Sequence, residues 1–135
     1  MAEKTKTNDM SRAVGRRKSA SARVRITLGK GKITVNSKDF TVYFPTKILQ
    51  DLVLLPLRTV SKEKDLDISV KVAGGGPKGQ AGAVSHGIAR ALVKWNEELK
   101  PLLKAEKLMT RDSRVKERKK PGLHKARRAH QWRKR

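Results

Sequence analysis

Apolar and polar side chains alternate along residues 20–28, where the apolar positions are Ala20, Ala22, Val24, Ile26 and Leu28. A period of two predicts a β-strand with one buried face. The Gly-Lys-Gly at residues 29–31 predicts a turn, followed by a second strand at residues 33–35. The alternation returns at residues 66–72 and predicts a strand that leads into a glycine-rich segment.

Two helices are predicted around the last of these strands. The first covers residues 45–55, with a proline in its first turn, and ends at Pro56. The second covers residues 80–99 and carries one apolar stripe, formed by Val84, Ile88, Leu92, Trp95 and Leu99. A place on this stripe favours the core for Trp95 over a role as a base-stacking platform. We expect Pro101 to end the helix and residues 102–109 to form a short further turn.

The order strand, strand, helix, strand, helix favours an α+β sandwich with helices on one face of a sheet. The chain has 135 residues, enough for one domain of ordinary size. We expect a flexible N-terminus at residues 1–12, a globular domain at residues 13–108 and an extended tail at residues 109–135.

The charge of the chain points to a polyanion partner. Lys and Arg number 34 against 12 Asp and Glu, a formal net charge of +22. Half of this excess lies in residues 104–135, which hold 14 basic and 3 acidic side chains. So high a charge opposes compaction unless an acidic partner neutralises it. Because apolar residues are scattered after Thr110 and Pro121-Gly122 breaks any helix, we interpret this segment as a polyanion-binding arm rather than a solvated end.

Candidate chemistry for an enzyme is sparse. The chain has no cysteine, so disulfides, zinc ribbons and thiol nucleophiles are excluded. The three histidines lack metal-ligand spacing, and the adjacent Ser85 and His86 point to different sides of a helix. Asp65 and Asp67 suit Mg²⁺ but are interpreted more simply as polar residues at a strand start. We predict no enzyme, cofactor, metal or small-molecule substrate, and no membrane association, because no apolar run is long enough to cross a bilayer.

Residues 74–79, Gly-Gly-Gly-Pro-Lys-Gly, match the G-x-G-x-x-G pattern of dinucleotide sites. The stiff Pro77 and the lack of a later strand to complete a βαβ unit count against that function. A phosphate-binding P-loop is excluded because Gln80 stands where a lysine is required. Backbone N–H groups of a glycine-rich loop, with Lys78, suit any phosphate, including that of RNA. A tight turn would alone explain several of the glycines.

Aromatic side chains make up only 4% of the chain, which favours contacts to a nucleic-acid backbone over base stacking. Trp132 is the exception, because it lies in the basic segment away from any local core. Two other functions stay open on these patterns. One is a general nucleic-acid compaction protein, and the other is a dinucleotide enzyme built on residues 74–79.

Three blocks of the sequence resemble the family of ribosomal protein nine of the small subunit. The first is residues 15–24, Gly-Arg-Arg-Lys-Ser-Ala-Ser-Ala-Arg-Val. The second joins residues 74–80 to Gly-Ile-Ala-Arg-Ala-Leu at residues 87–92, and the third runs from residue 110 to the closing Lys-Arg. The resemblance covers about residues 13–135, and Pro-Gly-Leu at 121–123 is similar to the bacterial and organellar form.

The resemblance implies a two-layer sandwich of a mostly antiparallel sheet with helices on one face, similar to the second domain of ribosomal protein five. It implies a cytoplasmic place in the ribosome, beside other proteins of the small-subunit head. The residues that it implies for ribosomal RNA are Arg16, Arg17, Lys18, Arg23, Arg25, Lys78, Gln80, Arg90, Arg111, Arg114, Arg118, Lys119, Lys120, Lys125, Arg127 and Arg128. The end of the tail would reach the P-site tRNA, with Arg133, Lys134 and Arg135 as contacts.

Overall fold

A five-stranded mixed sheet forms one layer of the computed structural model, which describes residues 10–132. The strands are β1 (Met10–Arg17), β2 (Ala20–Leu28), β3 (Ile33–Val35), β4 (Lys38–Asp39) and β5 (Leu66–Ala73). Their order across the sheet is β1-β2-β5-β3-β4. The described pairs are antiparallel except β3 with β5, which is parallel. A mostly antiparallel sheet is therefore confirmed.

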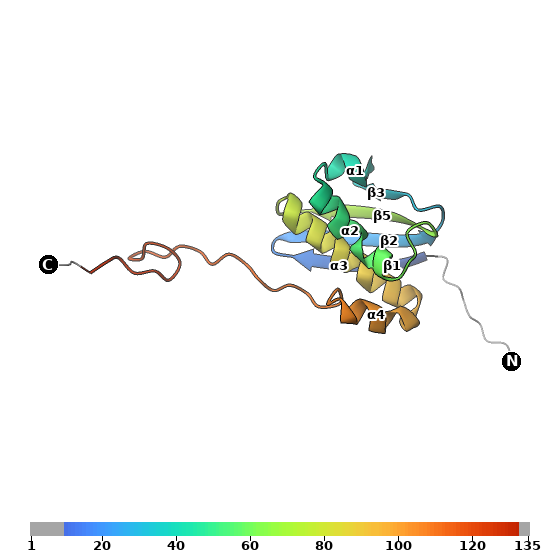
Figure 1. Cartoon of the computed structure of the whole chain (residues 1–135). Coiled ribbons are helices and arrows are strands. Elements are labelled where there is room, and N and C mark those ends of the chain that lie inside the picture. The colour runs from blue at the N-terminus through green and yellow to red at the C-terminus, as the bar shows by residue number, and fades with distance from the viewer. Residues whose placement is uncertain (1–9, 133–135) are drawn as a thin grey trace.

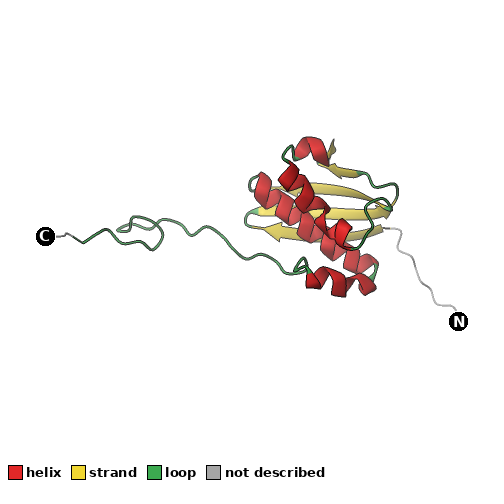
Figure 2. Ribbon diagram, viewed as in Figure 1, coloured by secondary structure: helices red, strands yellow, loops and turns green. Residues whose placement is uncertain are grey.

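The helices form the second layer. They are α1 (Phe40–Tyr43), α2 (Lys47–Thr59), α3 (Pro77–Trp95), the 3₁₀ helix η1 (Glu97–Leu99) and α4 (Lys100–Ala105). The two long helices, α2 and α3, lie side by side on one face of the sheet (Figures 1 and 2). α3 packs on β1 and β2, and α2 packs against α3. This confirms the α+β sandwich with helices on one face.

The core lies between the two layers and follows the predicted periods. β2 and β5 bury every second side chain toward the helices. From α3, Val84, Ile88 and Leu92 are completely buried against them. Leu99 is buried as well, and Trp95 is partly buried against the core, so its predicted core position is confirmed.

Strand β1 has no counterpart among the predicted strands, and its first three residues belong to the segment expected to be flexible. It pairs with β2 along its whole length. Its buried face consists of Ser11, Ala13 and Gly15, and small side chains give no hydrophobic period to detect. The Ser11 hydroxyl donates to the carbonyl of Ala91 in α3 at 2.8 Å, which satisfies the one buried polar group on that face. Residues 1–9 lie outside the described residues.

The two prolines that were predicted to end helices both lie within helices. α2 continues through Pro56 to Thr59, so the prediction that Pro56 ends this helix is wrong. Pro56 and Leu57 are buried, and this packing holds a turn in which the proline lacks an N–H to donate. Pro101 lies in the first turn of α4, where that N–H has no helical acceptor, and therefore starts a helix instead of ending one.

The boundaries of the long helix also differ from the prediction. α3 begins at Pro77 rather than Gln80, because proline suits the first helical turn. It ends at Trp95, since Asn96 adopts an extended backbone, and its side chain accepts from the N–H of Glu98 to start η1. The predicted continuation to Leu99 is therefore wrong, although Leu99 keeps its buried position.

From Glu106 to Trp132 the chain has no helix or strand, apart from an isolated bridge between Leu123 and Ala129. The last part of this segment leads away from the sandwich in Figure 1. Most of its side chains are exposed. Its role as an extended basic tail stays a prediction, and residues 133–135 lie outside the described residues.

Asp67 holds the turn between β2 and β3, and its removal is expected to destabilise the domain. Its carboxylate accepts from the backbone N–H groups of Lys32, Lys30 and Gly31 at 2.9, 2.9 and 3.1 Å. These bonds, led by those from Lys32 and Lys30, lower the pKa of Asp67 below its usual value. The resulting stabilisation is complete above the unfolded-state pKa of about 3.9 and is lost as pH falls through the lower folded pKa.

We therefore expect Asp67→Asn to lower the thermal midpoint at pH 7 and to flatten its dependence on pH between about 5 and 2. Asp65→Asn is the matched control, because that carboxylate is exposed and only reaches Lys62 at 3.8 Å. Differential scanning calorimetry across this pH range measures both variants. Equal thermal midpoints for the two variants at pH 7 would contradict the structural role of Asp67.

Candidate nucleic-acid interface

The predicted RNA-binding residues fall in three regions of the structure. The first region is the sheet with the turn between β1 and β2, where Arg16, Arg17, Lys18, Arg23 and Arg25 lie. The second is α3, which carries Lys78, Gln80 and Arg90. The remaining residues follow α4, namely Arg111, Arg114, Arg118, Lys119, Lys120, Lys125, Arg127 and Arg128. The proposed tRNA contacts Arg133, Lys134 and Arg135 lie outside the described residues.

The strands place Arg16, Arg23 and Arg25 on the face of the sheet that points away from the helices. Each is exposed, and each alternates with residues buried toward α3. Sequence reasoning missed Arg12 and Lys71, which are exposed at equivalent positions of β1 and β5. The alternation of β5 carries a signal for Lys71, because a polar residue between two buried apolar ones points to the opposite face of the sheet.

The glycine-rich loop before α3 is a tight turn. Gly74 and Gly75 have φ of +78° and +69°, and a Cβ on Gly74 would lie 2.4 Å from the carbonyl oxygen of Ser19. The Gln80 amide braces this turn, because its Nε2 donates to the Gly74 carbonyl at 3.0 Å and its Oε1 accepts from the Tyr43 hydroxyl at 2.7 Å. Both ends of the Gln80 amide thus have partners within the chain. Lys78 is exposed in the first turn of α3, where a phosphate could approach it.

A junction of charged side chains fastens the start of the C-terminal segment to the domain. Asp112 accepts from the guanidinium of Arg114 at 2.8 Å and lies 3.5 Å from Nη2 of Arg17, at the end of β1. Hydrogen bonds from the Arg114 side chain and backbone, together with the charge of Arg17, hold the pKa of Asp112 far below its usual value. The Arg17 side chain crosses Gly82 of α3, where a Cβ would lie 2.4 Å from its Cδ.

His86 contacts the same segment beside this junction. Its Nε2 lies 3.4 Å from the carbonyl oxygen of Met109. Burial, followed by the charges of Arg90 and Arg111, lowers the pKa of His86 despite the opposing effect of this contact. This lowered pKa favours the neutral imidazole. Leu108 and Met109 pack against the core next to it, so residues 108–114 lie on the domain rather than apart from it.

Beyond the junction, the basic side chains of the C-terminal segment are mostly exposed. Glu117 is the one acidic residue after Val115, and its carboxylate pairs with Lys120 and, at 2.8 Å, with Arg127. A short turn follows, in which the His124 N–H donates to the Arg128 carbonyl at 2.7 Å. One acidic side chain cannot neutralise the cations around it, so this segment keeps a strong positive charge.

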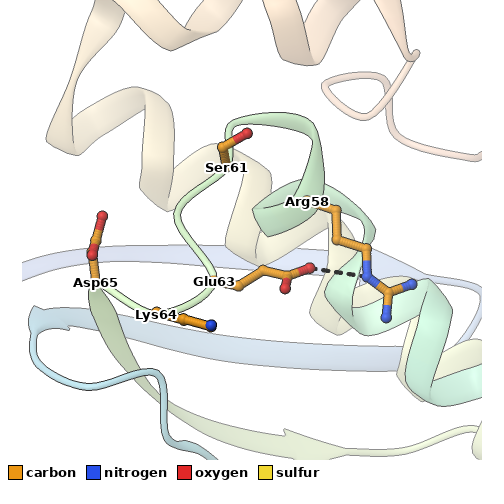
Figure 3. Close-up of a pocket in the computed structure, with 5 residues that line it drawn as sticks. All are labelled: Arg58, Ser61, Glu63, Lys64 and Asp65. Atoms are coloured by element: carbon orange, nitrogen blue, oxygen red, sulfur yellow. Dashed lines mark hydrogen bonds and ion pairs between the residues drawn. The ribbon is translucent and has the colours of Figure 1, made fainter.

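The hollow beside the loop between α2 and β5 carries both basic and acidic side chains, unlike the basic C-terminal segment (Figure 3). Arg58, Glu63, Lys64 and Asp65 line it with mixed charge. Arg58 is already paired, with Glu63 at 2.9 Å and with Asp51 at 3.2 Å. A surface with balanced charges offers little to a polyanion, and we exclude it from the interface.

Two further observations concern residues 10–132. No group of three or more His, Asp or Glu side chains in this range could hold a metal ion. Within the same range, no helix is long and apolar enough to cross a membrane.

The fold and these surfaces define a small, strongly basic α+β protein that carries its charge on exposed strand positions and on a C-terminal segment. The family model described as ribosomal protein S9/S16 matches residues 15–135. Over 124 residues the chain is 55% identical to the small ribosomal subunit protein uS9 of Mycoplasma pneumoniae, which covers 90% of this chain and 94% of that protein. The chain belongs to the ribosomal protein S9/S16 family.

This membership confirms the resemblance of the three sequence blocks to the family of ribosomal protein nine. The chain is a structural protein of the small ribosomal subunit and is not an enzyme. The alternative of a dinucleotide enzyme built on residues 74–79 is therefore wrong, and the steric demands at Gly74 give a structural reason for those glycines.

Proposed function

We propose that this protein binds ribosomal RNA in the head of the small subunit and that the end of its C-terminal tail contacts the P-site tRNA during translation. The proposal assigns the domain at residues 13–108 and the tail at residues 109–135 to these two partners. It also places the protein in cytoplasmic ribosomes, next to other proteins of the subunit head. The relative from Mycoplasma pneumoniae is named as a small-subunit protein, which supports this location.

The observation that carries the proposal is the distribution of charge. The predicted RNA-binding cations on β1, β2 and α3 are exposed, with Arg17 as a half-buried exception that pairs with Asp112. Ten basic side chains and one acidic side chain follow Val115. Arg and Lys bind phosphates and release counterions, which gives affinity without reading bases. A contact of this kind at the tail end suits the P-site, where one surface has to serve every tRNA.

The test uses small subunits reconstituted without their natural protein and supplied with this full chain or with a chain ending at Arg133. We expect both chains to remain with the subunits in a high-salt sucrose gradient and to protect the same ribosomal RNA positions from chemical probes. We expect only the shorter chain to weaken P-site tRNA binding, by roughly tenfold, because two phosphate contacts are lost.

Lys100→Gln combined with Lys104→Gln is the matched control, because it removes the same charge from exposed positions of α4 that have no proposed RNA contact. Unchanged tRNA affinity in the shortened chain, or an equal loss in this control, would refute the role of the tail end. Release of the full chain to the top of the gradient would refute a specific fit to ribosomal RNA and would favour a general compaction protein.

A further inference from the structure

The face of the sheet opposite the helices is a basic surface that no element of residues 10–132 covers, and we call it the open face. Its central positions come from three neighbouring strands, β1, β2 and β5. The exposed cations on them are Arg12 and Arg16 from β1, Arg23 and Arg25 from β2, and Lys71 from β5. α2 and α3 lie on the other side of the sheet, so neither covers these side chains (Figure 2).

The strand register brings like charges directly opposite one another. Arg12 pairs with Arg25 across β1 and β2, and Arg23 pairs with Lys71 across β2 and β5. Opposite residues of neighbouring strands have their Cβ atoms about 5 Å apart, and like charges at that separation destabilise a sheet. Among the described residues, none of these four cations forms an ion pair with an acidic side chain. A ligand that supplies negative charge would relieve this repulsion.

The same positive surface continues around the edge strand β1. Arg90 and Lys94 of α3 donate to the backbone carbonyls of Val14 and Arg12, the second at 3.1 Å. With Arg23 and Arg25 they line a hollow of about 440 Å³ beside the strand. Because the two side chains already occupy carbonyls of the sheet edge, this edge is poorly suited to pairing with an added strand of a protein partner.

The chemistry of the open face matches a phosphate backbone better than bases. The described strands place no aromatic side chain among its cations, so bases have no platform on which to stack. Three of the four cations that face one another across the strands are arginines. The planar guanidinium of arginine binds phosphate through two parallel hydrogen bonds. Small hydroxyl side chains surround them: Ser21 and Thr27 flank Arg23 and Arg25 along β2, and Ser69 lies opposite Arg25 on β5. They leave room for a backbone to approach.

We propose that the open face is an RNA-backbone-binding surface on which Arg12, Arg23, Arg25 and Lys71 contact phosphates. This inference rests on the proposed binding of ribosomal RNA, and it adds Arg12 and Lys71, which the sequence did not single out. In this proposal the two faces of the sheet have different roles. One face packs against the helices and forms the core, and the open face binds the RNA.

The test is a variant in which Arg12, Arg23, Arg25 and Lys71 are all replaced by glutamine. We expect the slope of log K against log salt for a small-subunit ribosomal RNA transcript to fall by about 3, since each phosphate contact contributes roughly 0.7–0.9. We expect the thermal midpoint of the same variant to stay constant or rise, because the like-charge pairs are gone. A residue with only a structural role would not show loss of RNA binding together with retained stability.

The matched control replaces four exposed lysines away from the open face, namely Lys47, Lys64, Lys100 and Lys104, with glutamine. An equal fall in slope for both variants would show that only net charge matters and would overturn the proposal. Undiminished RNA binding combined with loss of the open-face variant from reconstituted subunits would assign this face to an acidic protein and would also overturn it. Failure of the unmodified chain to prefer this transcript over a DNA duplex of equal length would instead refute the proposed function on which the inference rests.

Discussion

Gly15→Ala is expected to destabilise the domain by about 3 kcal/mol or more, an effect at the upper end for a single added methyl group. A Cβ on Gly15 would lie 1.9 Å from the carbonyl oxygen of Ala83 and 2.2 Å from the backbone N of Gly87. Both atoms belong to the backbone of α3, so no side chain can rotate away. The substitution forces β1 and α3 apart, and urea unfolding followed by circular dichroism measures the loss.

Gly76→Ala is the control for Gly15→Ala, because a Cβ at Gly76 meets nothing within 4 Å and φ there is −100°. We expect its unfolding midpoint to stay within the error of the unmodified protein. A Gly15→Ala protein as stable as this control would mean that the strand and the helix are not in backbone contact.

The strands differ in how well the sequence predicts them, and the close contact at Gly15 shows why. β2 and β5 carry branched apolar residues at every second position, and their buried faces follow directly from that pattern. β1 is buried on Ser11, Ala13 and Gly15, because α3 lies too close for larger side chains. Close packing of this kind leaves small residues without a period, and only the three-dimensional contact shows that they belong to the core.

The candidate interface was also only partly predictable from the sequence. Runs of Arg and Lys predict a surface that binds a polyanion, and the resemblance indicates the protein family. Pairings across strands were not visible, because the opposition of Arg23 to Lys71 joins residues 48 positions apart through the register of β2 and β5. The junction of Arg17 with Asp112 was hidden for the same reason, since it depends on where the chain passes after α4.

That junction decides where the chain can be shortened without disturbing the domain. Leu103 is completely buried, and Leu108 and Met109 pack against the core. Asp112 then pairs with Arg17, which belongs to β1. A chain that ends at Val115 keeps all of these contacts, whereas one that ends at the predicted domain boundary of residue 108 loses the junction.

Ending the chain at Val115 is expected to weaken binding to a small-subunit ribosomal RNA transcript by about a thousandfold at 0.1 M salt. The deletion removes ten basic side chains and one acidic side chain. If half of these cations contact phosphates, the slope of log K against log salt falls by about 3.5, which corresponds to that loss. The thermal midpoint is expected to stay unchanged, because residues 116–132 form no helix or strand and most of their side chains are exposed. Filter binding across a salt series and calorimetry measure the two quantities.

A chain with residues 116–135 in reversed order separates charge from position in this experiment. It restores every cation, so we expect the salt slope to recover with the bare transcript. In reconstituted subunits we expect it to remain defective in P-site tRNA binding, because the closing Lys134 and Arg135 are displaced to the start of the segment. Full recovery of tRNA binding by the reversed segment would show that the tail acts by net charge alone and that its end has no fixed partner.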